Sequence, residues 1–132
     1  MTKPGKEDHN LLRARTVLLV DESDNCRIPT KWFLTNFGFT VDTARSAEEA
    51  LLLFNPKHHD IVVTGDSMPA MNGIEMAHII KLRSPGTPVV MYGSAEPGDR
   101  ACLDAVVLRP SQPLALRDAI ESLIAARKVS SY

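Results

Sequence analysis

The chain has few cysteines, and their spacing matches no known ligand pattern. Cys26 and Cys102 are the two in 132 residues, and neither belongs to a Cys-x-x-Cys or Cys/His motif. The spacing therefore supports neither a disulfide framework nor a cysteine-ligated metal site. We expect both to be reduced side chains that pack inside the protein.

The chain also lacks an excess of charge of either sign. Fifteen Lys and Arg residues against sixteen Asp and Glu residues give a net charge of -1. Direct binding to DNA or RNA normally requires a strongly basic surface, so we expect no direct contact with nucleic acid.

Long hydrophobic runs are missing as well. No segment approaches the roughly 20 apolar residues of a membrane span. Residues 1–14 are polar and contain no apolar stretch followed by a small-residue cleavage site, so they predict a flexible arm and no secretory signal. We expect a cytoplasmic protein without membrane contact. Its length predicts one domain over 15–128, followed by a tail over 129–132.

What the chain does contain is a regular alternation of short apolar runs and segments of helical periodicity. Continuous apolar runs are typical of strands that are covered on both faces. Alternation with helices predicts βαβ units, and therefore a doubly wound α/β fold around one five-stranded parallel sheet. The segment from Glu96 to Leu103 leaves room for only a short fourth helix. The predicted strands are Thr16–Val20, Thr40–Ala44, Ile61–Thr64, Pro88–Tyr92 and Ala105–Leu108.

Charged side chains follow three of these strands. Asp21 and Glu22 come after the first, Asp66 lies just past the third, and Arg109 follows the fifth. The carboxyl ends of parallel strands form the working edge of such a sheet, so these groups are expected to converge. Adjacent carboxylates favour Mg²⁺, and a guanidinium can bind a phosphoryl group. A solvated acidic turn is equally compatible with this composition.

Four segments stand in order at a characteristic spacing: Val20-Asp21-Glu22, Asp60-Ile61-Val62-Val63-Thr64, Met68-Pro69-Ala70-Met71-Asn72-Gly73 and Arg109-Pro110. With them, the chain over about residues 16–127 resembles the receiver domain of bacterial two-component response regulators (CheY-like). The resemblance implies the flavodoxin-like fold with strand order 2-1-3-4-5. It also implies Mg²⁺-dependent transfer of phosphate from a sensor histidine kinase to an aspartate. The surface of the fourth and fifth strand-helix units would then contact a downstream signalling protein or form a homodimer.

The phosphoacceptor position departs from the family pattern. Counting from Asp60 or back from Met68 places Gly65 at that position and Asp66 one residue later. Gly93 likewise stands where the family has its switch Ser or Thr, and Ser94 follows it.

A shift of one residue along a strand turns a side chain to the opposite face unless the chain bulges. Two interpretations compete. Bulges at the two glycines could return Asp66 and Ser94 to the site, or both positions have lost their tasks. We favour the loss.

Two further positions differ from the family. Arg109 replaces its lysine, which keeps the charge but presents a planar fork. This side chain could form an ion pair with Asp21 or Glu22, or it could clamp a phosphate. Val106 stands where the family has its switching aromatic residue. If Mg²⁺ binds, the resemblance implies as ligands the side chains of Asp21, Glu22 and Asp66 and the carbonyl oxygen of Ser67.

The leading hypothesis is a stand-alone receiver-like module with a degenerate phosphoacceptor region, which acts through protein contacts. An alternative is a phosphorylatable receiver that uses Asp66 with Mg²⁺, Ser94 and Arg109. A less favoured one is a flavodoxin-like binder of a small ligand. No motif of an independent enzyme occurs. The remaining candidates are given structural roles: Trp32 and Phe33 as core, Tyr92 as core or sheet edge, His58 and His59 as a connector, and His78 as a surface or boundary residue.

Overall fold

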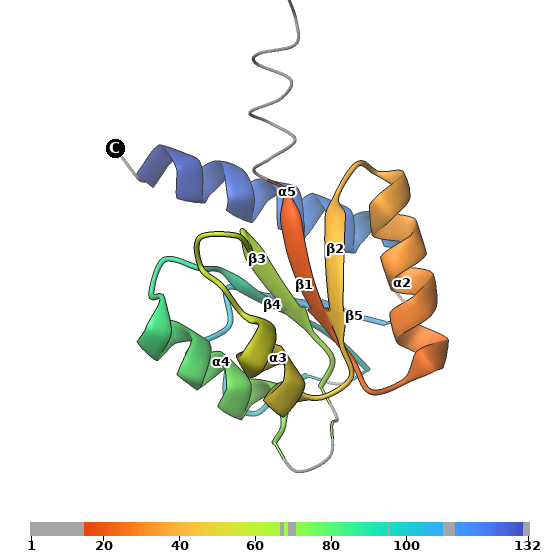
Figure 1. Cartoon of the computed structure of the whole chain (residues 1–132), viewed down its shortest axis with the longest axis horizontal. Coiled ribbons are helices and arrows are strands. Elements are labelled where there is room, and N and C mark those ends of the chain that lie inside the picture. Colours follow the sequence, from red (N-terminus) through yellow and green to blue (C-terminus); the bar gives the residue numbers. More distant parts are fainter. Residues whose placement is uncertain (1–14, 67, 69–70, 95, 110–112, 131–132) are drawn as a thin grey trace, which may run out of the picture.

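Five strands form one parallel sheet at the centre of the molecule (Figure 1). The computed structural model describes residues 15–130 apart from 67, 69–70, 95 and 110–112. The strand order is β2-β1-β3-β4-β5, which confirms the predicted fold. In chain order the elements are β1 (Thr16–Val20), α2 (Asp24–Asn36), β2 (Thr40–Ala44), α3 (Ala47–Leu53), β3 (Ile61–Thr64), α4 (Gly73–Arg83), β4 (Val89–Gly93), β5 (Ala105–Leu108) and α5 (Pro113–Ser130).

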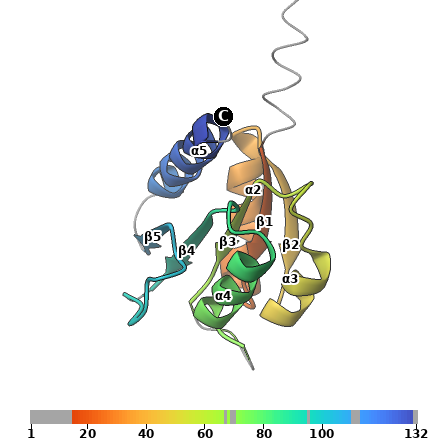
Figure 2. The ribbon, with the colours of Figure 1, turned by 90° about the vertical axis from the view of Figure 1, so that its left-hand side faces the viewer.

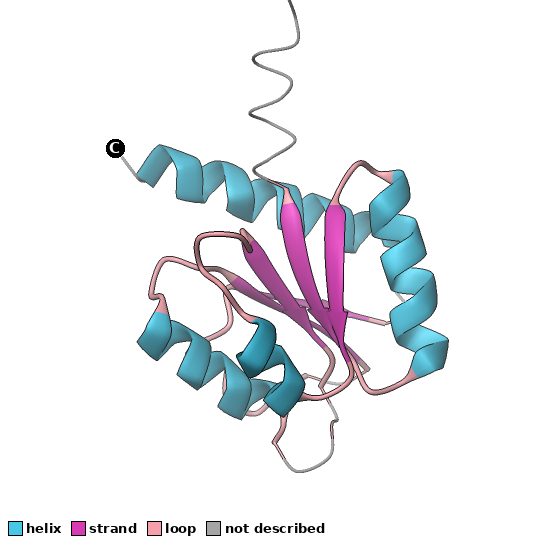
Figure 3. Cartoon of the chain, viewed as in Figure 1, coloured by secondary structure: helices cyan, strands magenta, loops and turns pink. Residues whose placement is uncertain are grey.

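The helices cover the sheet in two layers, as Figures 2 and 3 show. On one face, α2 and α5 pack on a buried cluster that includes Val17, Leu19 and Ile120. On the other face, α3 and α4 pack on a cluster that includes Leu18 and Val20. Successive strand residues point to opposite faces, so an unbroken apolar run supplies both clusters. This explains why the central strands are continuous hydrophobic segments.

Local signals in the sequence account for the helix ends. The Asn72 side chain accepts a hydrogen bond from the Glu75 N–H, and the Glu75 carboxylate accepts one from the Asn72 N–H. This capping box fixes the start of α4 and confirms the predicted cap. Ser46 caps α3 through the N–H of Glu49. After α2 the chain turns at Gly38, whose φ of 93° is a conformation that glycine adopts without strain.

The connection between β4 and β5 departs from its prediction. The described residues of this segment, 94 and 96–104, form bends and turns and no helix. The sequence left room for a short helix, but Pro97 and Gly98 interrupt it and too few residues follow before β5. The described part of the connection therefore contains no fourth helix, where the sequence predicted a short one.

The prediction for Trp32 was wrong, because this side chain is 68% exposed and contributes nothing to the core. Ile28, one helical turn earlier, is 59% exposed. Phe33 and Phe37 instead pack against the core cluster of that face. Neighbouring aromatic residues in a helix point about 100° apart, so Trp32 and Phe33 take different faces.

The predicted ends of the domain lie partly outside the described residues. This holds for the arm over 1–14 and for residues 131–132. Helix α5 runs to Ser130, past the predicted boundary at 128. None of the described helices is long and apolar enough to cross a bilayer.

Candidate functional site

Asp21 directly follows β1, whose carboxyl end lies at the lower edge of the sheet in Figure 1. The residue is 8% exposed, and its Oδ1 accepts a hydrogen bond from the Ser23 N–H at 2.9 Å. Its backbone carbonyl accepts one from Arg27 at 3.0 Å. The neighbouring Glu22 is exposed. The two adjacent acids therefore lie in different environments, and Asp21 alone is built into the fold.

Arg109 provides the positive charge beside Asp21. Its N–H donates a hydrogen bond to the Gly93 carbonyl at 2.7 Å, which holds the residue at the end of β4. Its Nη1 lies 3.8 Å from Asp21 Oδ2, so the predicted ion pair is formed with Asp21. This buried nitrogen finds no hydrogen-bond acceptor among the described residues. The pair is held by charge and not by a hydrogen bond.

The same guanidinium lies over the ring of Tyr92, 5.3 Å from its centroid. Tyr92 is 9% exposed, in agreement with its predicted place in the core. Burial raises the pKa of its phenol, the charge of Arg109 lowers it, and Cys26 raises it. A cavity of about 210 Å³ lies beside these side chains, with Phe33 of α2 and Leu116 of α5 among its walls. Arg109 thus lies between an acidic group and an aromatic, mostly apolar cavity.

Gly65, at the phosphoacceptor position of the pattern, lies against Asp21. A Cβ on Gly65 would be 3.0 Å from Asp21 Oδ2, which is tighter than ordinary contact. Gly73 approaches from the other side, where a Cβ would be 2.6 Å from the Gly65 carbonyl oxygen. The start of α4 therefore packs directly on the end of β3. This contact gives a physical reason for the glycine in Met71-Asn72-Gly73.

Asp66 and Ser94, the two displaced residues, meet each other. Asp66 Oδ2 accepts hydrogen bonds from the Ser94 N–H at 2.9 Å and from its hydroxyl at 3.3 Å. The carboxylate passes over Gly93, where a Cβ would be 2.5 Å from Asp66 Cγ. The two one-residue shifts are therefore a single feature, because Gly93 leaves the space that Asp66 fills.

The predicted Mg²⁺ ligands do not converge. Among the described residues, Asp21, Glu22 and Asp66 do not bring three carboxylate oxygens within 4.8 Å of one another. Arg109 provides beside Asp21 the positive charge that a cation would provide. Ser67, the predicted carbonyl ligand, lies outside the described residues. As placed here, the three carboxylates do not together surround one Mg²⁺, which takes its oxygen ligands in a compact octahedron.

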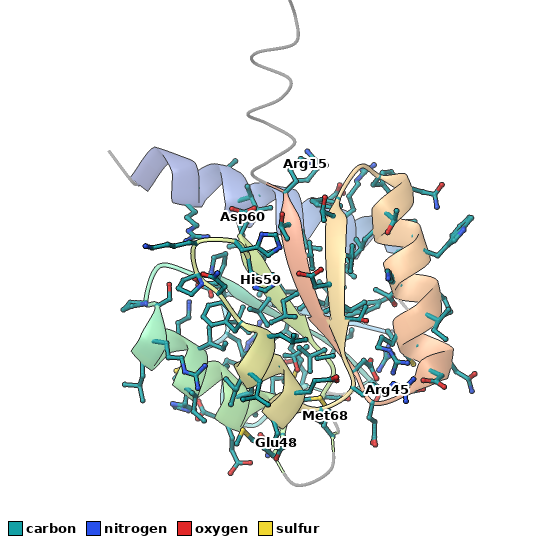
Figure 4. The ribbon with its side chains drawn as sticks, viewed as in Figure 1. Arg15, Arg45, Glu48, His59, Asp60 and Met68 are labelled. Atoms are coloured by element: carbon teal, nitrogen blue, oxygen red, sulfur yellow. The ribbon has the colours of Figure 1, made fainter. Side chains whose placement is uncertain are left out.

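His58 and His59 form a cluster with Asp42, whose part in it the sequence analysis missed, toward the opposite end of the sheet, where Figure 4 labels His59. His58 and His59 both direct Nε2 to Asp42 Oδ2, at 3.3 and 2.8 Å. His59 Nδ1 accepts a hydrogen bond from the Asn55 N–H at 3.1 Å. A neutral imidazole with an accepting Nδ1 carries its proton on Nε2, which then donates to Asp42. His59 Nε2 has no lone pair for a metal in this state. The cluster is therefore a set of hydrogen bonds that ties the α3–β3 connection to β2, consistent with the predicted helix-to-strand connector.

Comparison with known proteins adds a family match. The family model described as "Response regulator receiver domain" matches residues 17–109. The autoinducer 1 sensor kinase/phosphatase LuxN of Vibrio harveyi is 30% identical over 88% of this chain and 14% of its own length. The probable transcriptional regulator ycf27 of Cyanidium caldarium is 29% identical over 92% of this chain and 49% of its own length. The chain therefore spans less than half the length of these relatives.

A solved structure agrees with the sequence match. The response regulator receiver domain protein of Clostridium thermocellum has a TM-score of 0.82 and 25% identity. The match covers 87% of this chain and 98% of that one.

Proposed function

The chain belongs to the response regulator receiver domain family of two-component signalling, and from this premise we propose that it is a receiver with a degenerate phosphoacceptor pocket. In this proposal the module acts through protein contacts, and phosphorylation of an aspartate is not required. The observation that carries it is the place of Gly65 beside the Asp21–Arg109 ion pair. The position that accepts phosphate in the family pattern has no side chain here.

The neighbouring Asp66 does not fill that place. Its carboxylate is turned to Ser94 and lies over Gly93, and it shares no three-acid cluster with Asp21 and Glu22. Receiver domains generally bind Mg²⁺ in an acidic pocket, but this pocket pairs its buried acid with Arg109. In this proposal the guanidinium compensates the charge of Asp21 without a metal ion.

The proposed partners follow from the family. Receiver domains interact with sensor histidine kinases, so a sensor histidine kinase or a downstream signalling protein is the expected partner here. The loss of the helix between β4 and β5 changes the surface by which such domains are recognised. We propose that partner contacts, or a homodimer, use this altered face in a cytoplasmic protein that does not bind nucleic acid directly.

A second candidate function is favoured by one specific contact. Asp66 and Ser94 have moved together and remain hydrogen bonded, as an acceptor and its hydroxyl partner would be. In this alternative, Asp66 accepts the phosphoryl group and Arg109 swings from Asp21 to bind it. That movement breaks no hydrogen bond of Arg109 Nη1 among the described residues, and it gives up the ion pair with Asp21 in exchange for the phosphoryl group.

The two candidates are separated by incubation with acetyl phosphate and Mg²⁺ and by intact mass. We expect no phosphate on the unaltered chain. We also expect its NMR spectrum to stay unchanged when beryllofluoride, a mimic of the phosphoryl group, is added with Mg²⁺. A gain of one phosphate that disappears in Asp66→Asn would establish the second candidate. The matched control is Asp60→Asn, which removes a carboxylate at the opposite end of the sheet and leaves Asp66 in place.

A further inference from the structure

A cysteine, a histidine and an aspartate lie in line on the surface formed by α4 and the β4–β5 connection. Cys102 Sγ is 3.3 Å from His78 Nδ1. On the other side of the ring, His78 Nε2 is 3.5 Å from Asp99 Oδ2, and Asp99 Oδ1 accepts the Ala101 N–H at 2.9 Å. Neither the family nor the proposed function uses these residues.

The hydrogen-bonding order of the three groups defines what His78 does. An ionised carboxylate only accepts hydrogen bonds, so Asp99 requires the proton of a neutral His78 on Nε2. The lone pair of Nδ1 then faces Cys102, whose S–H is its donor. The Ala101 N–H, and after it the bond from His78, lower the pKa of Asp99, so the carboxylate keeps its charge. A nucleophile, a base and a group that orients the base are therefore in sequence.

We propose that Cys102 is a nucleophilic thiol with His78 as its base, and that it is a site of oxidation by hydrogen peroxide. His78 Nδ1 takes the Sγ proton, and the thiolate attacks one peroxide oxygen. The O–O bond breaks as the S–O bond forms, and the departing hydroxide takes the proton from Nδ1 and leaves as water. Sulfur is oxidised to a sulfenic acid, the peroxide is reduced, and His78 returns to its neutral state.

The position of Cys102 gives the modification a structural consequence. Cys102 and Leu103 pack against the hydrophobic cluster below α3 and α4. Oxidation places a polar hydroxyl beside this cluster and removes the hydrogen bond from Sγ to His78. The β4–β5 connection would then shift relative to α4. Cys26 lines the cavity between α2 and α5 on the other face of the sheet, so it is not in place to form a disulfide with Cys102.

Cys26 provides a matched control, because it is partly buried like Cys102 but has no histidine beside it among the described residues. His59 is bonded to Asp42, and His78 to Cys102. We would measure alkylation by iodoacetamide, with intact mass as the readout, for Cys102 in Cys26→Ser and for Cys26 in Cys102→Ser. We expect Cys102 to react on the order of tenfold faster than Cys26 at neutral pH, because the thiolate is the nucleophile. In guanidinium chloride the two thiols should react alike.

The role of His78 is tested by His78→Gln in the Cys26→Ser background. Without the base, we expect the alkylation rate of Cys102 to fall to within about twofold of the alkylation rate of Cys26. His78 is 49% exposed, so the variant should fold, and far-UV circular dichroism checks this. Equal rates for the two thiols in the folded protein, or an unchanged rate in His78→Gln, would overturn the proposal.

Asp99 is a positioning residue for His78. Its test therefore measures which nitrogen of His78 carries the proton. We expect ¹⁵N spectra to show the proton of His78 on Nε2, and Asp99→Asn to abolish that preference and slow the alkylation of Cys102. Hydrogen peroxide with a dimedone trap should label Cys102 and leave Cys26 unlabelled. A proton on Nδ1 of His78, or equal dimedone labelling of both cysteines, would contradict the mechanism.

Discussion

The two ends of the parallel sheet differ in how completely their charged side chains are hydrogen bonded. At the amino ends, where Figure 4 labels Asp60 and His59, the polar side chains of both residues have hydrogen-bond partners. Asp60 Oδ2 accepts the Thr16 N–H at 2.9 Å, and Arg127 donates to the Asp60 carbonyl at 2.9 Å. At the carboxyl ends, Asp21 and Arg109 face each other at 3.8 Å, and Arg109 Nη1 lacks an acceptor among the described residues.

The difference concerns how completely the charged groups at each end are hydrogen bonded. A buried polar group that is fully hydrogen bonded holds its neighbours in one arrangement, whereas a charge without such bonds can change partner at little cost. At the amino end, hydrogen bonds of Asp60, His59 and Arg127 therefore join the strands to the neighbouring loops and to α5. The carboxyl end keeps groups that can rearrange, and glycines allow the close approaches between them. Four substitutions test this contrast, from the largest expected effect to the smallest.

Gly73→Ala should have the largest effect. A Cβ at this position would lie 2.6 Å from the Gly65 carbonyl oxygen and 2.8 Å from Thr64 Oγ1. Because backbone must move, we expect a loss of about 3 kcal/mol in the free energy of unfolding, measured by urea denaturation. Gly86→Ala is the control, since nothing lies within 4 Å of a Cβ there. Equal losses would mean that α4 does not pack on β3 as described.

His59→Ala tests the amino end. The variant leaves the Asn55 N–H and the Asp42 carboxylate without their buried partner and removes a ring that stacks on Phe54. We expect a loss of about 2 kcal/mol in the same assay. His58→Ala is the matched control, because His58 is 53% exposed and its contact with Asp42 should contribute under about 1 kcal/mol. If the two variants cost the same, the buried hydrogen bonds of His59 do not stabilise this end of the sheet.

Gly93→Ala tests the contact between the displaced residues. The atoms that a Cβ would meet belong to the side chain of Asp66, which can turn away. We expect a loss of about 1 kcal/mol, close to the lower limit for overpacking. The amide resonance of Ser94 should shift, since its N–H loses the Asp66 acceptor. Gly98→Ala should change neither quantity, and an unchanged Ser94 resonance in Gly93→Ala would refute the contact.

Arg109→Met should have the smallest effect, a change in the pKa of Tyr92. Burial is the main cause that raises the pKa of its phenol above 10.0, and the charge of Arg109 opposes it. The folded state therefore retains the phenol proton longer than the unfolded state, so this contribution to stability is lost as the pH rises above 10.0. Arg109→Met should raise the pKa of Tyr92 further, measured by ultraviolet absorbance in a Tyr132→Phe background. A downward shift would mean that Arg109 does not lie over the ring.

Much of the fold could be predicted because its signals are local. The apolar run Ile61–Thr64 reads as a buried strand from its own residues, and Asn72 and Glu75 form a capping box within one helical turn. The face that Trp32 takes could not be predicted in the same way. Aromatic residues are adjacent in α2, and only the packing of Phe33 on the core sets the helical phase.

The site was harder to predict, because its contacts join distant parts of the chain. Asp66 and Ser94 were each identified as displaced by one residue, but the sequence gives no sign that Gly93 lets them meet. Likewise, Cys102 and His78 are 24 residues apart, and each has an unremarkable local sequence. Tertiary packing alone brings such pairs within hydrogen-bonding distance.

Trp32 is the only tryptophan of the chain, and 68% of it is exposed on the outer face of α2. Its fluorescence therefore reports on whatever covers that helix and hardly at all on the melting of the core. A blue shift of its emission would register a docked molecule directly, without a dye or a label. The same exposure makes intrinsic fluorescence a poor measure of unfolding for this protein.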